Sequence, residues 1–219
     1  MSRRFDAVVF DLDGTLVDSA PDMAAALNAA LAEVGLDPFS LGEVISFVGS
    51  GGRILVRRAL AARGARDLDE TEMLGRFITQ YEGKLDGQTQ SYPGVMAMLA
   101  RLQEAGVPMG LCTNKPEGPA RGVCAALGLD TFMPVIVGGD TLPVLKPDPA
   151  PLLHVCRALR VMPEATLYVG DSETDYVTAQ AARTPFAFVE GGYQSRPIRD
   201  FAPTFTLKSP ALVAELVLG

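Results

Sequence analysis

The sequence predicts an α/β protein, a doubly wound parallel sheet with a small α-helical domain inserted after the first strand. The segment from Phe5 to Phe10 is a short apolar run rich in Val and Phe, which is typical of a strand buried on both faces. From about residue 95 onward, apolar runs of strand length alternate with helical patterns, which indicates βαβ units. Between these regions the patterns are helical, which favours a separate helical unit.

The first strand ends abruptly at the segment Asp11-Leu12-Asp13-Gly14-Thr15. Gly14 lets the backbone turn at once, because a residue without a Cβ adopts positive φ freely. Two carboxylates therefore lie where a buried strand emerges, and open α/β sheets place their ligands at such strand ends. The pattern favours one carboxylate as nucleophile and the other as acid/base, with a hard metal ion relieving their repulsion. A simple turn after a core strand is the alternative explanation.

The helical insert is expected to begin at Ser19 or Ala20, with a first helix that has Pro21 in its first turn and stops at Gly35. Further helices are predicted where apolar residues recur at spacings of three and four, over residues 42–47, 53–63 and 70–85. The polar segment over residues 88–94 ends in Pro-Gly and is expected to be a turn and linker. The predicted domains are an α/β core of residues 1–15 and 89–219 and a helical insert of residues 16–88.

After the linker, helices and strands are expected to alternate. Helices are predicted over residues 95–105, 118–127, 150–159 and 173–182, and strands over residues 107–112, 134–137, 166–169 and 186–189. An edge strand over residues 204–207 and a helix from Pro210 onward are expected to follow. Because the strands are parallel, their carboxyl ends should meet at one edge of the sheet.

Three more polar segments are expected at that edge. Thr113 and Asn114 follow a strand directly and can donate hydrogen bonds to phosphate, although such residues are more often helix caps. Lys146 lies in a loop stiffened by two prolines, which favours a side chain that points inward. A lysine buried in this way needs an anion as partner. A solvated loop lysine is the alternative explanation. Asp171 and Asp175 follow another strand, and a helix cap with an acidic first turn would also explain them.

These four segments, in this order, resemble the motifs of the haloacid dehalogenase superfamily of phosphohydrolases, whose members form an aspartyl-phosphate. The first of them, DLDGTLVDS, is similar to that family's first motif. The resemblance implies a Rossmann-like core, with Asp11 as nucleophile and Asp13 as general acid/base. It also implies that Thr113, with Asn114 beside it, and Lys146 bind the phosphoryl group. An acid at position 13 separates the chain from the dehalogenase branch, where that position is not acidic.

For the metal, the resemblance implies Mg²⁺ held by Asp11, Asp171 and the backbone carbonyl of Asp13, with Asp175 just outside these ligands. A site with few oxygen ligands, completed by a phosphate, agrees with that metal. Asp11 is expected to be ionised at pH 7, because an unperturbed aspartate has a pKa of about 3.9.

Two longer stretches, DLDGTLVDSAPDM and VGSGGRILVRRAL, resemble phosphoglycolate phosphatases. This resemblance implies that the helical insert is a cap that closes over the sheet, and that 2-phosphoglycolate is the substrate. The loop from Val48 to Arg53 would then set specificity: Gly51 and Gly52 let the backbone come close, and Arg53 offers a planar fork suited to a carboxylate. A flexible turn with a solvated Arg53 is the alternative.

Composition limits the partners and the location. The net charge of −7 and the lack of a Lys/Arg cluster argue against nucleic acid or an anionic membrane, and no apolar run approaches the ~20 residues of a membrane span. The first strand begins so near Met1 that no signal peptide is expected.

Three cysteines in apolar segments, Cys112, Cys124 and Cys156, are typical of reduced thiols in a cytoplasmic protein. A nucleophilic cysteine would need a histidine as its base. His154 lies two residues from Cys156, a spacing that points their side chains apart, so a thiol nucleophile is not expected.

The motifs leave other functions open. A phosphatase acting on a sugar phosphate or pyrophosphate, or a β-phosphoglucomutase, would share them. A phosphonate hydrolase is less favoured, because that branch needs a cap lysine for a Schiff base and this loop has Arg53 instead. An inactive regulatory or binding relative usually lacks Asp11 or Asp13, and both are present. Whether the protein is a monomer or a homodimer does not follow from the sequence.

Overall fold

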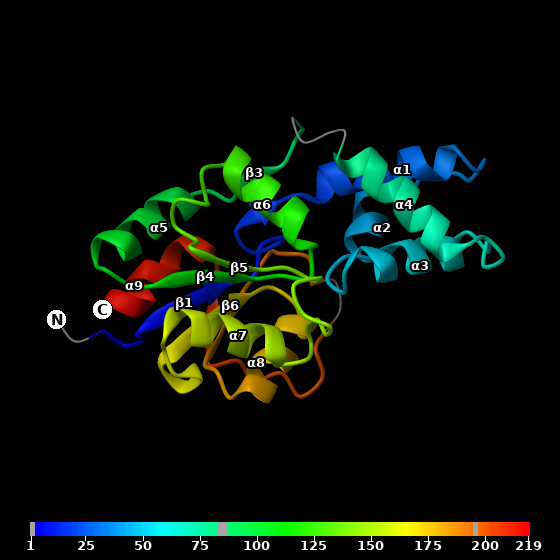
Figure 1. Cartoon of the computed structure of the whole chain (residues 1–219). Helices are drawn as coiled ribbons and strands as arrows, with labels where there is room; N and C mark the ends of the chain where they lie inside the picture. The colour runs from blue at the N-terminus through cyan, green and yellow to red at the C-terminus, as the bar shows by residue number, and fades with distance from the viewer. Residues whose placement is uncertain (1–2, 83–86, 195–196) are drawn as a thin grey trace.

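The computed structural model describes residues 3–82, 87–194 and 197–219 (Figure 1). Within these residues, six strands form a sheet in the order β5-β4-β1-β6-β7-β8, and each neighbouring pair is parallel. The strands are β1 (Ala7–Phe10), β4 (Met109–Cys112), β5 (Val135–Val137), β6 (Thr166–Gly170), β7 (Phe186–Val189) and β8 (Phe205–Leu207). The predicted α/β fold with a parallel sheet is confirmed.

Helices cover both faces of this sheet. One face packs against α5 (Val95–Glu104), α6 (Glu117–Ala126) and α9 (Val213–Leu218), and the other against α7 (Ala150–Leu159) and α8 (Glu173–Ala182). The short 3₁₀ helices η1 (Pro163–Ala165) and η2 (Pro210–Leu212) precede β6 and α9. In β1, Val8 and Phe10 join one apolar cluster and Val9 joins the other, because successive strand residues point to opposite faces. This double burial explains the continuous apolar run of the first strand.

The order of the strands places β1 at the centre of the site. The chain fills one side of β1 with β4 and β5, and then crosses to the other side to form β6, β7 and β8. The strand order therefore reverses next to β1. Open α/β sheets bind ligands at such a switch point, in the crevice outside the carboxyl ends of the strands.

Between β1 and the rest of the core, the described part of the chain forms four helices, and they have an apolar cluster of their own. They are α1 (Ala20–Ala32), α2 (Leu41–Ile45), α3 (Gly52–Ala62) and α4 (Glu70–Glu82), and Figure 1 shows them at the end of the sheet opposite the N-terminus. Their cluster contains Leu27, Leu55 and Phe77. The predicted helices are present, although residues 83–85, where the last one was expected to end, lie outside the described residues.

Two short strands join the helical insert to the core, and the sequence did not predict them. β2 (Val17–Asp18) and β3 (Gln90–Ser91) pair antiparallel, so the segment expected to be only a turn and linker is partly a strand. Two residues are too few to show an alternating pattern. The carboxylate of Asp22 reinforces the junction by accepting hydrogen bonds from the backbone of Gln88 and Thr89. The boundaries of a cap over residues 16–88 stay a prediction.

The three cysteines, Cys112, Cys124 and Cys156, are free and buried, as expected. Burial raises the pKa of the Cys112 thiol to about 12 and that of Cys124 to about 11, so these thiols are poor nucleophiles near neutral pH. Among the described residues, no helix combines the length and the apolar character that crossing a membrane requires.

Candidate active site at the carboxyl edge of the sheet

The strand ends bring the predicted acids together. Asp11 follows β1 and Asp171 follows β6, while Asp175 lies in the first turn of α8. One carboxylate oxygen from each of these three side chains lies within 4.8 Å of the others, and all three residues are buried. Lys146 reaches the same cluster from the loop between β5 and α7, with its Nζ 3.0 Å from Asp11 Oδ1. Segments that are far apart in the sequence therefore form one charged cluster.

The turn after β1 fixes the position of Asp171. Gly14 has φ +86°, and a Cβ added there would lie 2.4 Å from Asp171 Oδ2, so this position needs glycine for both conformation and space. Thr15 Oγ1 donates a hydrogen bond to Asp171 Oδ1 at 2.7 Å, and the backbone N–H of Tyr193 donates to Oδ2 at 2.6 Å. Asp171 is thus held by both the first motif and the loop after β7.

Asp175 orients Lys146 toward Asp11. Its Oδ1 accepts hydrogen bonds at 2.7 Å from Lys146 Nζ and from the Tyr168 hydroxyl. Its Oδ2 accepts from the backbone and hydroxyl of Ser172, which completes a capping box at the start of α8. Asp175 therefore does belong to a helix cap, and the same carboxylate also holds Lys146 in the site.

Burial changes the protonation of the cluster. It raises the pKa of Asp11 to about 7, with Lys146 opposing the rise and Asp175 adding to it. Burial also raises the pKa of Asp171 well above its ordinary value, and the neighbouring carboxylates Asp175 and Asp11 add to the rise. The expectation that Asp11 keeps an ordinary aspartate pKa is therefore wrong, because the sequence does not show how completely the side chain is buried.

The carboxylate oxygens of this cluster suit a hard divalent cation. Asp11 Oδ1 is buried and has no aligned hydrogen-bond donor among the described residues, although it lies 3.0 Å from Lys146 Nζ. Asp11, Asp171 and Asp175 offer only oxygen ligands, which suit Mg²⁺ or a similar ion better than metals that prefer sulfur or nitrogen. Both oxygens of Asp171 and of Asp175 already accept hydrogen bonds, but of these two only Asp175 also pairs with the Lys146 ammonium group among the described residues, so Asp11 and Asp171 are the better candidates for direct ligands.

Asp13 is held by a second lysine, which the sequence analysis did not single out. Lys115 Nζ lies 3.1 Å from Asp13 Oδ1 and 3.2 Å from Oδ2, and Ser19 Oγ also donates to Oδ1. Burial disfavours the charge of Lys115, but Asp13 and the Tyr81 hydroxyl raise its pKa above the ordinary value. Lys115 precedes Pro116, the same Lys-Pro pair that drew attention to Lys146, so this signal was available in the sequence.

Thr113 and Asn114 also lie in the site. Both are buried, and neither caps α6, whose N-cap is Pro116. Thr113 Oγ1 accepts a hydrogen bond at 3.2 Å from the backbone N–H of Lys115, and Asn114 Nδ2 donates at 2.9 Å to the carbonyl of Lys146. Asn114 Oδ1 is buried without a hydrogen-bond partner among the described residues. Asn114 thus ties the segment after β4 to the loop that carries Lys146, while Thr113 holds the backbone of its own segment.

A loop of the helical insert borders two hollows that reach Asp11 and Asp13. Both hollows are lined by residues 48–50 of this loop. One, of about 450 Å³, also contains polar groups such as Ser46, Arg58 and Thr174. The other, of about 480 Å³, contains the rest of the predicted specificity loop (Gly51, Gly52 and Arg53) and the apolar side chains Met23, Leu55, Leu74, Phe77 and Ile78. The loop is thus beside the site, as a specificity loop would have to be.

The arginines of this region differ in their partners. Arg53, 51% exposed, lies 3.3 Å from Glu70, which also pairs with Arg57 at 2.7 Å. Arg58 instead donates to the backbone carbonyl of Phe47 at 3.0 Å, and no ion pair engages it in the described part of the chain. Two arginines therefore line hollows at the site, and only Arg53 was predicted there.

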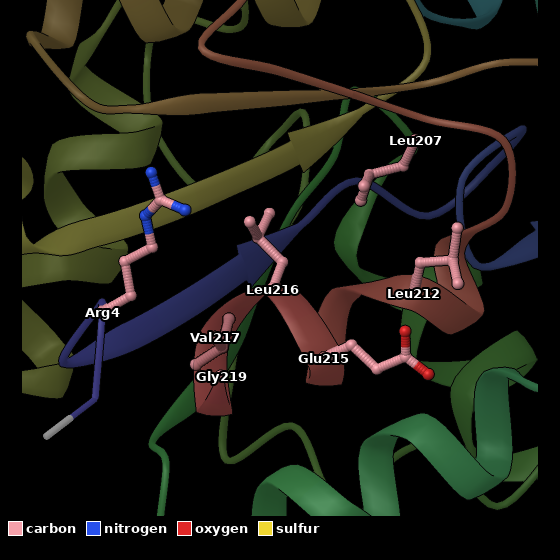
Figure 2. Close-up of a pocket in the computed structure, with 7 residues that line it drawn as sticks. All are labelled: Arg4, Leu207, Leu212, Glu215, Leu216, Val217 and Gly219. Atoms are coloured by element: carbon pink, nitrogen blue, oxygen red, sulfur yellow. The ribbon is translucent and has the colours of Figure 1, made fainter. Parts of the chain in front are cut away.

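A further hollow, of about 620 Å³, lies beside α9 (Figure 2). Figure 2 shows Arg4 at one end and Leu207 and Leu212 at the other, with Leu216 between them. Glu215 supplies the one acidic side chain among its lining residues, and the hollow includes no residue of the four motifs. It therefore lacks the paired aspartates and the buried lysine of the site at the sheet edge.

Comparisons with known proteins agree with this geometry. A model of the haloacid dehalogenase-like hydrolase family matches residues 8–189. A phosphoglycolate phosphatase of Cereibacter sphaeroides is 49% identical over 195 residues, 88% of this chain and 88% of that protein. Phosphoglycolate phosphatase 1 of Pseudomonas aeruginosa is 43% identical over 91% of this chain and 75% of that protein.

Solved structures are similar over nearly the whole chain. The crystal structure of a predicted phosphoglycolate phosphatase from Haemophilus somnus 129pt has a TM-score of 0.91 and 30% sequence identity, and the match covers 97% of this chain and 98% of that one. CbbY from Rhodobacter sphaeroides, solved in complex with phosphate, has a TM-score of 0.79 at 22% identity, covering 94% of this chain and 95% of that one. At that identity the second similarity concerns the fold alone.

The parallel sheet, the four motifs at its carboxyl edge and the helical insert define a class of enzyme, and the chain belongs to the haloacid dehalogenase-like hydrolase family. Within that family it is a phosphatase, like the relatives that match most of its length.

Proposed function

We propose that the protein hydrolyses 2-phosphoglycolate to glycolate and phosphate with the help of Mg²⁺, through an aspartyl-phosphate on Asp11. The observation that carries this proposal is the arrangement around Asp11, which is buried, faces Lys146 at 3.0 Å and lies in a carboxylate cluster with Asp171. The names of the relatives at 49% and 43% identity support phosphoglycolate as the substrate.

The mechanism assigns a separate task to each carboxylate of the first motif. An oxygen of Asp11 forms a bond to phosphorus while the bond from phosphorus to the glycolate oxygen breaks, and Asp13 gives its proton to that leaving oxygen. Asp13 then takes a proton from water as the water oxygen attacks phosphorus, which releases phosphate and restores the Asp11 carboxylate. Lys146, with Thr113 and Asn114, offers donors to the phosphoryl oxygens throughout.

The metal site is proposed at Asp11 and Asp171, with the backbone carbonyl of Asp13 as a third ligand and Asp175 outside the ligands. When bound, Mg²⁺ supplies positive charge that stabilises the phosphoryl oxygens and favours the ionised form of Asp11. Asp175 accepts a hydrogen bond from Lys146 Nζ at 2.7 Å and so aims this lysine at Asp11.

Recognition of the glycolate carboxylate is proposed for the loop of the helical cap, over residues 48–53. Arg53 would have to leave Glu70 to reach a substrate, whereas Arg58 has no acidic partner among the described residues. Replacing whichever arginine binds the carboxylate by Ala should lower kcat/KM for phosphoglycolate roughly 10- to 150-fold, equivalent to about 1.5–3 kcal/mol. An aryl phosphate without a carboxylate should lose much less.

The free, buried cysteines support a cytoplasmic location.

A phosphate-release assay tests this function. Phosphoglycolate should give a higher kcat/KM than sugar phosphates and pyrophosphate, and glucose 1-phosphate should not isomerise. A chelator should remove activity and Mg²⁺ should restore it, whereas Ca²⁺ should restore little, because its longer bonds to 6–8 ligands would misplace Asp11. A sugar phosphate as best substrate would overturn the proposed specificity, and full activity in chelator would overturn the metal's role.

A further inference from the structure

Each carboxylate of the first motif faces its own buried lysine. Lys146 pairs with Asp11 and Lys115 with Asp13, and the side chains of these two lysines are 2% and 6% exposed. Burying an ammonium group is costly unless an anion and good hydrogen bonds compensate. The proposed mechanism uses Lys146 for the phosphoryl group and so far gives Lys115 no task.

The contacts of Lys115 suit it to hold Asp13 in place. Its Nζ lies almost equally far from the two oxygens of Asp13, at 3.1 and 3.2 Å, and so spans the carboxylate. The backbone of Lys115 is itself fixed: its N–H donates to Thr113 Oγ1 at 3.2 Å, and its carbonyl accepts from Gly139 N–H at 2.8 Å. Among the described side chains, Ser19 is the only other hydrogen-bond partner of the Asp13 carboxylate.

The other side of Lys115 is anchored by the helical insert. Lys115 Nζ donates to the Tyr81 hydroxyl at 2.8 Å and lies 4.5 Å from the centre of that ring. Tyr81 is on α4, is buried and packs near Phe77 with ring centres 5.9 Å apart. A chain of contacts therefore runs from the insert through Lys115 to Asp13.

We propose that Lys115 is a positioning residue that holds Asp13 in place for both proton transfers, and that Tyr81 anchors Lys115 from the helical insert. The proposal rests on the function proposed above for Asp13. Lys115 keeps its protons throughout: the Asp13 proton goes to the leaving oxygen in the first step, and a water proton replaces it in the second. Without Lys115, the Asp13 carboxylate would be free to turn about Ser19, and a displacement of about 1 Å can cost ~10²-fold in rate.

Hydrolysis of p-nitrophenyl phosphate separates the two steps. Its leaving group needs little protonation, so Asp11 can be phosphorylated without Asp13, whereas hydrolysis of the aspartyl-phosphate still needs Asp13 as base. In Lys115→Met we expect a larger burst of p-nitrophenol and more acid-stable phosphoenzyme than in wild type, followed by a steady-state rate lower by ~10²-fold. Lys115→Arg should restore part of the rate, because it returns a cation.

Two further variants complete the test. Tyr81→Phe removes one hydroxyl and should shift the burst in the same direction by a smaller factor, which keeps the proposal testable if Lys115→Met does not fold. Lys208→Met, at an exposed lysine, is the matched control and should behave as wild type. Melting curves show whether each variant is folded.

The proposal is overturned if folded Lys115→Met and Tyr81→Phe keep the wild-type burst and steady-state rate. It is also overturned if they lose rate without accumulating phosphoenzyme, which would assign Lys115 to phosphoryl binding or to structure. Asp13→Asn in the same assay separates this failure from a failure of the proposed function. If Asp13→Asn accumulates phosphoenzyme and Lys115→Met does not, only the role of Lys115 is wrong; if Asp13→Asn also accumulates none, the role of Asp13 is wrong.

Discussion

Asp11 must be a carboxylate in order to attack phosphorus, yet its surroundings favour the protonated form. Burial raises its pKa to about 7, and the nearby carboxylates of Asp175 and Asp13 act in the same direction. Lys146 at 3.0 Å lowers the pKa but does not cancel the effect of burial. A cation among these acids would favour the ionised nucleophile, so the burial that raises the pKa of Asp11 also makes the site attract positive charge.

This arrangement predicts how stability depends on pH. The pKa of Asp11 rises from about 3.9 in an unfolded chain to about 7 in the folded one, so its contribution is fully present below about pH 3.9 and is lost as the pH rises to about 7. Asp171 shifts in the same direction. In chelator, Tm should therefore fall between about pH 5 and pH 7.5, and Mg²⁺ should reduce that fall.

Thermal unfolding across this range, with chelator and with Mg²⁺, makes the measurement. Asp11→Asn is the control, because an amide does not titrate and its Tm should vary less with pH. A Tm that rises with pH in chelator, equally in wild type and in Asp11→Asn, would contradict the assignment of the pKa shift to this cluster.

At the scale of elements, the turn that joins β1 to the insert places Asp171. Gly14, at φ +86°, would bring a Cβ to 2.4 Å from Asp171 Oδ2, whereas Gly35, at φ +72°, has nothing within 4 Å of such an atom. Both positions disfavour an L side chain by about 1–2 kcal/mol. Only Gly14 adds a collision with a carboxylate of the site.

Gly14→Ala and Gly35→Ala should thus separate strain from function. Gly35→Ala should lose about 1–2 kcal/mol of unfolding free energy in denaturant titrations, and Gly14→Ala should lose more because of the added collision. Gly14→Ala should in addition bind Mg²⁺ more weakly and lose most of its phosphatase activity, because Asp171 must move. Equal activity in the two variants would show that Asp171 does not need its observed position.

Element by element, the sequence predicted what depends on long patterns and missed what depends on contacts. The bounds of α7 and α8 agree with the predicted helices, since their apolar spacing and flanking residues mark both ends. The strands β2 and β3 are too short for any pattern. Lys115 was overlooked because its partners, Asp13 and Tyr81, are distant in sequence. The pairing of Arg53 with Glu70 is equally a matter of tertiary packing.

At the scale of the whole molecule, the apolar residues form separate clusters in the insert and on the faces of the sheet. One cluster holds Leu27 and Phe77 from the helical insert, and another holds Leu99 from α5 with the strand residues Val8 and Phe10. Separate clusters allow the insert to open locally while the sheet stays folded.

Leu27→Ala should reveal this independence. Its side chain is fully buried, and removing it should cost about 2–5 kcal/mol. Hydrogen exchange should accelerate most in α1 and α4 and much less in β1, β4 and β6. Leu99→Ala, the same change in the sheet's cluster, is the matched control and should accelerate exchange in the strands. A uniform acceleration in Leu27→Ala would mean that insert and sheet unfold as one unit.

In the proposed mechanism, Asp11 carries the phosphoryl group during turnover. The most direct measurement is to quench the enzyme with acid while it hydrolyses phosphoglycolate, and to locate the added mass by peptide mass spectrometry. We expect one phosphoryl group on the peptide that contains Asp11, with fragmentation placing it at residue 11, and no such adduct or turnover in Asp11→Asn. A phosphoryl group on another residue, or steady turnover by Asp11→Asn, would contradict it.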